Sequence, residues 1–310
     1  ASQAPSSEEP AETTDDSGGY PIPAVDFKAP TDPFCRDTYK IVNLNIAQTP
    51  FGAFMDECYT QLGEKLNYEF TTLAFNADID ITKLSYHAYA YVADNYKLLT
   101  SGSALGRGNG PLLISKYEIS PDENKNIKVA IPGKYTTANL LFHIFYPEIT
   151  QKQECLFSAI EDAVVCGEAD AGVIIHETRF TYQDKGLRKV VDLGEKWERK
   201  TNSPIPLGGI VVQRKIDNQL QQKINRVLKR SVQYAFENPE KSYPFVKKYA
   251  QEMDEVVMRK HIGLYVNNFT VELGDEGKRA ITVLYEEAVR NSVIAEMPQD
   301  VFVGNSLISD

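Results

Sequence analysis

Residues 172–182 read GVIIHETRFTY, and this stretch is the most informative one in the chain. An apolar run ends at His176, which predicts a buried strand that presents an imidazole at its carboxyl end. Ligands of open α/β sheets bind outside the carboxyl ends of the strands, so a titratable group there is well placed for chemistry. The alternative is that His176 is a packing residue whose ring is satisfied inside the protein.

Short apolar runs alternate with helical patterns on both sides of this stretch. The alternation predicts an α/β domain with a mostly parallel sheet. Strands are expected at residues 39–47, 79–85, 126–133, 172–176 and 204–215. A helix is expected over residues 86–95, and from about Asn218 the pattern is helical nearly to the end.

The strand and helix units of the first lobe are interrupted by a central segment and then resume, which is typical of a two-lobed, hinged binding fold. The chain has 310 residues, 42% of them hydrophobic, which is enough for a substantial core divided over two lobes. We expect lobe one to comprise residues 39–125 and 207–310, and lobe two residues 126–206. A cleft between the lobes is then the expected small-molecule site.

The N-terminal part of the chain differs from the rest in composition. Residues 1–19 are acidic, without a basic residue or an aliphatic one larger than alanine, so we expect a disordered tail. The proline-rich segment that follows, up to residue 38, is expected to be extended. The chain begins with Ala1, and such a tether resembles the linker after a removed export or lipoprotein signal, which makes export one expectation.

Charge and cysteine content exclude several classes of function. The formal net charge is −10 and no basic stripe is present, which argues against a nucleic-acid surface. No apolar run approaches the length of about 18 residues that a transmembrane helix needs. The four cysteines form no cluster of metal-binding type and leave the disulfide status open; they are Cys35, Cys58, Cys155 and Cys166.

Three segments at predicted strand ends offer groups that one cleft can collect. Residues Lys83, Leu84 and Ser85 place an ammonium and a hydroxyl where a strand passes into a helix, although Ser85 alone is equally well explained as a helix cap. Thr136 and Thr137 follow Gly133 at the start of a helix, where hydroxyls and free amides suit a carboxylate or a phosphate. His176 ends the third segment.

Two further features favour structural roles. The loop SGSALGRGNGP at residues 101–111 lacks the Lys-Ser/Thr ending of a phosphate loop and is not followed by a helix, so we predict a hinge or a close-packed crossing. Its Arg107 is expected to pair with an anionic ligand or with a carboxylate of the protein. His261 stands at the head of a helical pattern with Tyr265, and we expect it to lie away from the site.

Seven colinear segments carry a resemblance to a known family. They are DIDITKLSYHAYAYV (78–92), SGSALGRGNGPLLISK (101–116), VAIPGKYTTANLL (129–141), GEADAGVIIHETRFTY (167–182), VVDLGEKW (190–197), SPIPLGGIVV (203–212) and YVNNFTVELGDEG (265–277). Together they resemble the 1,4-dihydroxy-6-naphthoate synthase family of the futalosine route to menaquinone, over about residues 73–310. The resemblance implies the two-lobed α/β fold of type 2 periplasmic binding proteins, with a ligand cleft between the lobes.

The resemblance also implies roles for individual residues. His176 corresponds to the active-site base of the family. The substrate-binding positions correspond to Lys83, Leu84, Ser85, Thr136, Thr137 and Ala138. The implied substrate, cyclic dehypoxanthine futalosine, is a small carboxylated compound, which agrees with an anchor of hydroxyls and amides and with proton removal by a neutral imidazole. No metal or redox cofactor is implied.

One region departs from the family. Family members have an SPCPNDTF-like loop after the first strand, where this chain has AQTPFGAF at residues 47–54, and a following Asp-Val-Glu-x-Leu-Asn run is missing. This departure keeps a second hypothesis open, an exported solute-binding protein that holds a carboxylated ligand without turnover. The family implies a cytoplasmic location and the second hypothesis a periplasmic or membrane-tethered one. The sequence leaves the oligomeric state open, a homodimer included.

Overall fold

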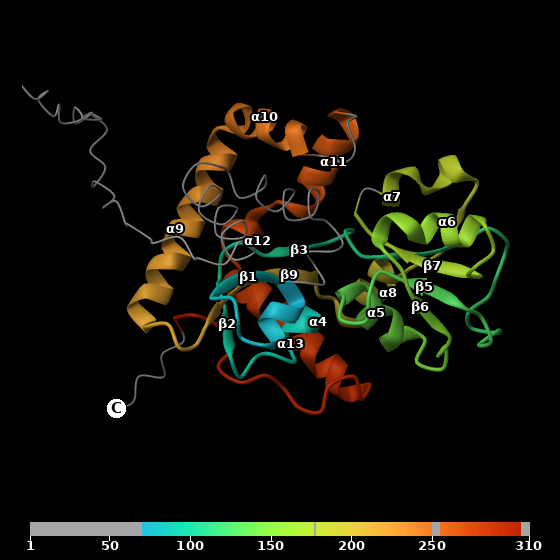
Figure 1. The fold of residues 1–310 in the computed structure, drawn as a ribbon, viewed down its shortest axis with the longest axis horizontal. Coiled ribbons are helices and arrows are strands. Elements are labelled where there is room, and N and C mark those ends of the chain that lie inside the picture. Colours follow the sequence, from blue (N-terminus) through green and yellow to red (C-terminus); the bar gives the residue numbers. More distant parts are fainter. Residues whose placement is uncertain (1–69, 177, 250–254, 305–310) are drawn as a thin grey trace, which may run out of the picture. The chain divides into compact units, whose positions relative to one another are not determined.

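A computed structural model describes residues 70–176, 178–249 and 255–304, which form an α/β fold with two sheets (Figure 1). The predictions for residues 1–38, for the strand at 39–47 and for the loop at 47–54 lie outside the described residues, as do Cys35 and Cys58.

The first sheet is built around one long strand. Among the described residues it has four strands, which are β1 (Ile81–Ser85), β2 (Tyr96–Leu98), β3 (Ala104–Gly106) and β9 (Ile205–Gln213). Each of the other three pairs with β9, and every pairing is antiparallel. All nine residues of β9 are buried, so the strand is covered on both faces.

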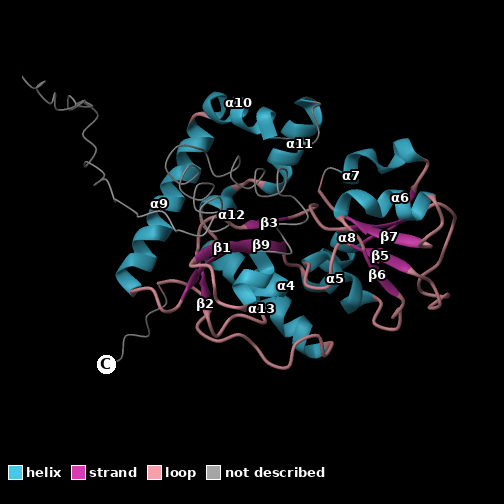
Figure 2. Cartoon of the chain, viewed as in Figure 1, coloured by secondary structure: helices cyan, strands magenta, loops and turns pink. Residues whose placement is uncertain are grey.

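The second sheet has strands in the order β6-β5-β7-β4-β8 (Figure 2). Their bounds are β4 (Leu112–Ser115), β5 (Val129–Ile131), β6 (Lys152–Glu154), β7 (Ala171–Ile174) and β8 (Arg188–Asp192). The strand β5 runs parallel to β6 and β7, whereas β4 is antiparallel to both of its neighbours. The prediction of a mostly parallel sheet is therefore wrong for the described strands. Short, fully buried apolar runs look alike in the two orientations, so their pattern does not determine direction.

Helices cover both faces of the second sheet. Alternate residues of β4 point to opposite sides: Leu113 packs with Phe142 of α5, and Leu112 and Ile114 pack in the cluster that includes Ile160 of α6. Figure 2 shows α5 and α6 on opposite faces of this sheet. The helices and 3-10 turns of this region are α5 (Thr137–Phe145), η1 (Phe157–Ala159), α6 (Ile160–Val165), α7 (Thr178–Thr181), η2 (Tyr182–Lys185) and α8 (Leu193–Thr201).

The C-terminal part is helical, as the sequence predicts. Residues 70–75 are also helical, and the further named helices are α4 (Tyr86–Tyr89), α9 (Asn218–Glu237), α10 (Pro239–Tyr249), α11 (Glu255–Tyr265), α12 (Asn268–Val271) and α13 (Gly274–Arg290). On α13, Ile281, Leu284 and Tyr285 lie on one face and belong to the largest core cluster, which also holds Tyr86 and Tyr89. In the part of the chain described here, no helix combines the length and the apolar character that a membrane crossing requires.

Element boundaries follow local chemistry where a capping residue is present. The strand β1 ends at Ser85, as predicted, because the Ser85 hydroxyl accepts the Ala88 N–H and starts α4. That helix ends at Tyr89 instead of residue 95, since the Asp94-Asn95 pair favours a turn before β2. The strand β4 lies within the predicted first lobe by number yet pairs into the second sheet. The lobe boundaries themselves remain a prediction.

The glycine-rich loop forms a close-packed crossing, one of the two structural roles predicted for it. A Cβ atom placed on Gly110 would lie 2.4 Å from the Cα of Gly194 and 2.8 Å from Cδ1 of Ile205. A Cβ on Gly194 would lie 2.9 Å from the Cα of Gly110. Real Cβ atoms do not approach so closely, so the two backbones touch here because neither residue has a side chain.

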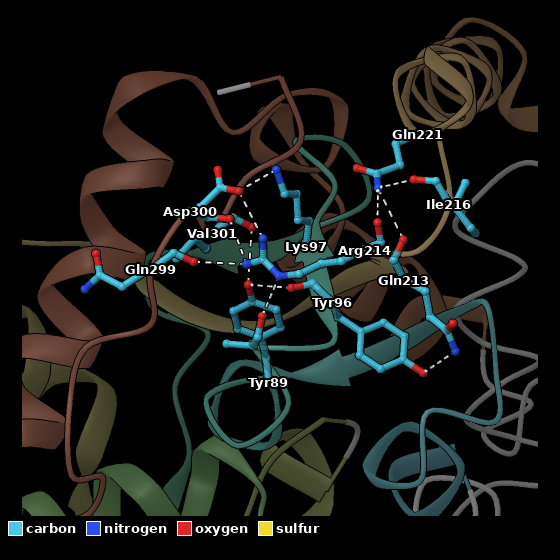
Figure 3. A network of polar contacts seen from close by, with 11 residues as sticks. Tyr89, Tyr96, Lys97, Gln213, Arg214, Ile216, Gln221, Gln299, Asp300 and Val301 are labelled. Atoms are coloured by element: carbon cyan, nitrogen blue, oxygen red, sulfur yellow. Dashed lines mark hydrogen bonds and ion pairs between the residues drawn. The ribbon is translucent and has the colours of Figure 1, made fainter. Parts of the chain in front are cut away.

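Arg214, directly after β9, ties the C-terminal segment to the first sheet (Figure 3). Its guanidinium donates to the carbonyl oxygens of Ala93 at 2.7 Å, Gln299 at 3.0 Å and Asp300 at 2.9 Å, and to the Asp300 carboxylate at 3.0 Å. Lys97 pairs with the same carboxylate at 2.5 Å. Burial raises the pKa of Asp300, but the hydrogen bonds and charges of Lys97 and Arg214 outweigh it and hold the pKa below its usual value.

Replacing Arg214 with methionine is expected to lower the free energy of unfolding by about 2–3 kcal/mol, mainly because three backbone carbonyls lose their donor. The ion pair itself contributes little, since the two side chains are 25% and 44% exposed. Urea denaturation of the two proteins measures the difference. Lys215→Met is the matched control: its pair with Asp80 is 67% and 65% exposed, so a loss above about 1 kcal/mol would contradict the assignment.

Candidate active site

The end of β1 presents one charged and one hydroxyl side chain on the same face. Lys83 and Ser85 are two residues apart in the strand, so both leave it on one side, while Leu84 turns into the main core. Lys83 is buried, with 8% of its surface exposed. The Ser85 hydroxyl donates to the Tyr135 carbonyl at 2.5 Å and accepts the Ala88 N–H at 2.9 Å. The capping role predicted as one alternative for Ser85 is confirmed.

The start of α5 lies against the end of β1 and against β9. Thr136 is the N-cap: its hydroxyl accepts the Asn139 N–H at 3.2 Å and donates to the Gly133 carbonyl at 2.8 Å. The Thr137 hydroxyl donates to the Leu207 carbonyl of β9 at 2.7 Å. Ala138 is buried in the core of the second sheet. The structure thus brings together Ser85, Thr136 and Thr137 through Tyr135.

These hydroxyl groups cannot all serve as donors to a ligand. A hydroxyl donates a single hydrogen bond, and those of Ser85, Thr136 and Thr137 already donate to backbone carbonyls. In this conformation the hydroxyls are therefore bonded to the backbone, and a ligand-binding role for them stays a prediction. The N–H groups of Thr137 and Ala138 remain, because they have no acceptor within their own helix, whereas that of Asn139 donates to the Thr136 cap.

His176 lies in the turn after β7, which ends at Ile174, two residues before the end of the predicted strand. Its backbone has φ = 67°, a left-handed conformation that is uncommon for residues other than glycine. The His176 N–H donates to the Tyr265 hydroxyl at 3.1 Å, and the Thr178 hydroxyl donates to the Ile175 carbonyl at 2.8 Å. The turn is thus held from α11 and from its own next residues.

Three aromatic rings of the described residues contact the His176 imidazole. Their ring centroids lie 5.5 Å away for Phe157, 5.4 Å for Tyr265 and 5.9 Å for His261, which is nearly perpendicular to His176. The expectation that His261 lies away from the site is wrong. His261 does not head a helix but lies within α11, four residues before Tyr265, so the two share one helix face.

Burial and nearby positive charge keep the His176 ring neutral. Burial is the largest cause, and the charges of His261 and of Lys83 add to it, so the pKa of His176 lies well below its usual value. The charge of Lys83, on β1, thus acts on the imidazole that follows β7. A neutral imidazole can accept a proton at pH 7, which a protonated one cannot.

A second histidine is perturbed for a structural reason. Burial lowers the pKa of His87 to about 4, although the bond of its Nδ1 with the Thr136 carbonyl at 3.1 Å opposes this. His87 and Tyr135 pack in an aromatic group with Phe75 and Tyr91 beside the start of α5. The pKa of three described histidines is lowered, those of His87, His143 and His176, and the charge of Lys83 contributes only at His176.

Arg107 is engaged elsewhere. Its guanidinium lies 3.4 Å from the Glu276 carboxylate and 4.0 Å from that of Glu198, with an exposed side chain. It pairs with carboxylates of the protein, one of the two roles expected for it, and no contact joins it to His176 or Lys83. Arg179, three residues after His176, instead donates to the carbonyls of Gly108, at 3.1 Å, and of Gly110. The glycine-rich loop is thereby attached to the turn that carries His176.

Comparison with known proteins identifies the family. A family model described as "Menaquinone biosynthesis" matches residues 64–290. The chain belongs to this family. A protein of Thermus thermophilus named 1,4-dihydroxy-6-naphthoate synthase is 40% identical over 230 residues, which are 74% of this chain and 84% of the relative. A Streptomyces coelicolor protein of the same name is 40% identical over 233 residues, 74% of this chain and 82% of the relative.

Solved structures confirm the fold predicted from the resemblance. A crystal structure of a protein from Archaeoglobus fulgidus is 33% identical and superposes with a TM-score of 0.70, covering 80% of this chain and 97% of that one. The ligand-binding component of an ABC-type import system from Staphylococcus aureus is 11% identical, with a TM-score of 0.55 and coverage of 76% and 82%. The fold resembles that of type 2 periplasmic solute-binding proteins.

Proposed function

We propose that this chain converts cyclic dehypoxanthine futalosine to 1,4-dihydroxy-6-naphthoate, with His176 as the general base. The supporting observation is a buried imidazole just after β7 that packs against the rings of His261 and Tyr265 and whose pKa is lowered by burial and by the charges of His261 and Lys83. The 40% identity to two proteins named for this product supports the same reaction. The proposal includes a cytoplasmic location, which a lipoprotein signal encoded ahead of Ala1 would contradict.

In the proposed reaction, the chain supplies acid–base chemistry. The imidazole of His176 takes a proton from the bicyclic substrate, and the electron pair left behind expels the sugar-derived fragment as the ring becomes aromatic. A base with a pKa below 7 is unprotonated at neutral pH and so is ready to act. The protein groups proposed here carry this step without a redox cofactor.

The substrate carboxylate has two sources of positive potential in the site. The first is the ammonium of Lys83, which is buried and therefore screened less by solvent than a surface lysine. The second is the start of α5, where the N–H groups of Thr137 and Ala138 carry the positive end of the helix dipole. We propose that these groups, and not the threonine hydroxyls, hold the carboxylate.

The direct test is turnover of cyclic dehypoxanthine futalosine by the purified full chain, with 1,4-dihydroxy-6-naphthoate followed by liquid chromatography. Formation of the product supports the proposal. If the substrate raises the melting temperature but is not consumed, the chain is a solute-binding protein with the same fold. If it is neither bound nor consumed, the chain is a non-catalytic member of the family.

A further inference from the structure

The imidazole of His261 contacts the proposed base from a separate element. The His176 and His261 ring centroids are 5.9 Å apart with an interplanar angle of 74°. Tyr265 lies one turn further along α11, with its ring 4.7 Å from that of His261 and 5.4 Å from that of His176. Two side chains of a single helix face therefore pack on the same imidazole.

The His261 ring is buried where it contacts His176. His261 is 8% exposed, so packing holds its ring in place, and that ring in turn restrains the imidazole in contact with it. Tyr265, on the same helix face, binds the backbone of His176: its hydroxyl accepts the His176 N–H at 3.1 Å. Tyr265 thus holds the main chain of the turn, while His261 contacts the side chain.

The His176 side chain needs such a contact. Its backbone lies in a left-handed turn at the end of a strand, not inside a regular element that limits side-chain rotamers. The imidazole plane then depends on the groups that contact the ring, which among the described residues include Phe157 on one element and His261 and Tyr265 on another. A general base acts only when its ring nitrogen is aimed at the proton it removes.

We propose that His261 is a positioning residue for His176, which fixes the plane of the His176 imidazole in the orientation that proton removal requires. The inference rests on the proposed function of His176 as the base. Among the described residues, the charges of Lys83 on β1 and His261 on α11 act on His176, and the rings of His261 and Tyr265 contact it. Removal of His261 therefore removes one of two groups whose positive charge disfavours protonation of His176.

The kinetic test compares His261→Ala with His261→Phe. Loss of the ring in His261→Ala is expected to lower kcat about 100-fold with little change in KM, because the base is misaligned but the substrate anchor is intact. His261→Phe keeps a flat ring and is expected to recover most of kcat. In both variants the acid limb of the kcat profile shifts to higher pH, since His176 is protonated more easily without the second imidazole.

A second readout needs no substrate. The chain has four histidines, so NMR can assign each ring by single substitution and follow its titration in the free protein. The titration midpoint of His176 is expected to rise in both His261 variants, and the His176 signal is expected to broaden in His261→Ala alone. This result is independent of turnover, so it separates a failure of this inference from a failure of the proposed function.

His143→Gln is the matched control. His143 is a partly buried histidine of α5 whose pKa is lowered by burial and by Lys152, and no contact joins it to His176. The control should leave kcat, its pH profile and the titration of His176 unchanged. The inference is overturned if His261→Ala leaves the titration of His176 unchanged. It is also overturned if a folded His261→Phe is as inactive as His261→Ala.

Discussion

Replacement of His176 by asparagine is expected to lower kcat for cyclic dehypoxanthine futalosine by at least about 1000-fold, within the range that removal of a general base produces. Asparagine has no group that accepts a proton at neutral pH, and it tolerates the left-handed backbone of this position better than most residues. His176→Ala should lose the same activity. Steady-state product formation measures the effect.

Circular dichroism and thermal unfolding serve as controls for the His176 variants. The backbone bond to Tyr265 comes from the main-chain N–H and stays available in His176→Asn, so the fold should remain intact. Turnover within tenfold of the wild-type rate in a folded His176→Asn protein would remove the base assignment. Turnover absent from the wild type as well would instead reject the proposed reaction.

Replacement of Gly110 by alanine is expected to lower the free energy of unfolding by more than about 3 kcal/mol, since the new methyl overlaps backbone that cannot move aside alone. The added Cβ would lie 2.4 Å from the Cα of Gly194. Gly194→Ala meets the same obstacle from the other side and should be similarly damaging. Urea denaturation, or loss of the soluble protein on expression, measures the effect.

Gly108→Ala is the control for this prediction, two residues away in the same loop. A Cβ on Gly108 meets nothing within 4 Å, and the only cost is the left-handed backbone at φ = 69°. That cost is about 1 kcal/mol. If Gly108→Ala and Gly110→Ala destabilise the protein equally, the loop is sensitive to backbone strain alone and the close-packed crossing is not what stabilises it.

The sequence predicts those features of the fold that depend on a residue and its near neighbours. Ser85 and Thr136 start helices where predicted, because a hydroxyl before a helical pattern is a local signal. The strand ending before His176 follows from its apolar run. The direction of the strands does not follow, since β4 and β9 receive their antiparallel partners from distant segments.

In the candidate site, too, the sequence predicts what depends on neighbouring residues and not what depends on distant ones. The place of His176 after a strand predicts a functional role, whereas the sequence around His261 does not show which residues lie opposite its helix. A signal was present in HIGLY, residues 261–265, where two polar aromatic side chains are spaced by four. The sequence also does not show which groups the Ser85 and Thr137 hydroxyls bind, because the acceptors lie far along the chain. The Thr137 hydroxyl, for example, donates to the carbonyl of Leu207, 70 residues away.

The left-handed backbone of His176 means that stability and activity favour different residues at this position. Glycine at this position would relieve the strain of φ = 67°, which is of the order of 1 kcal/mol. Selection for heat resistance alone would therefore favour the loss of the imidazole, and only selection for turnover retains it. A member of this family that has abandoned the reaction would be expected to show glycine or asparagine here first, so this one position can report whether a homologous chain is still an enzyme.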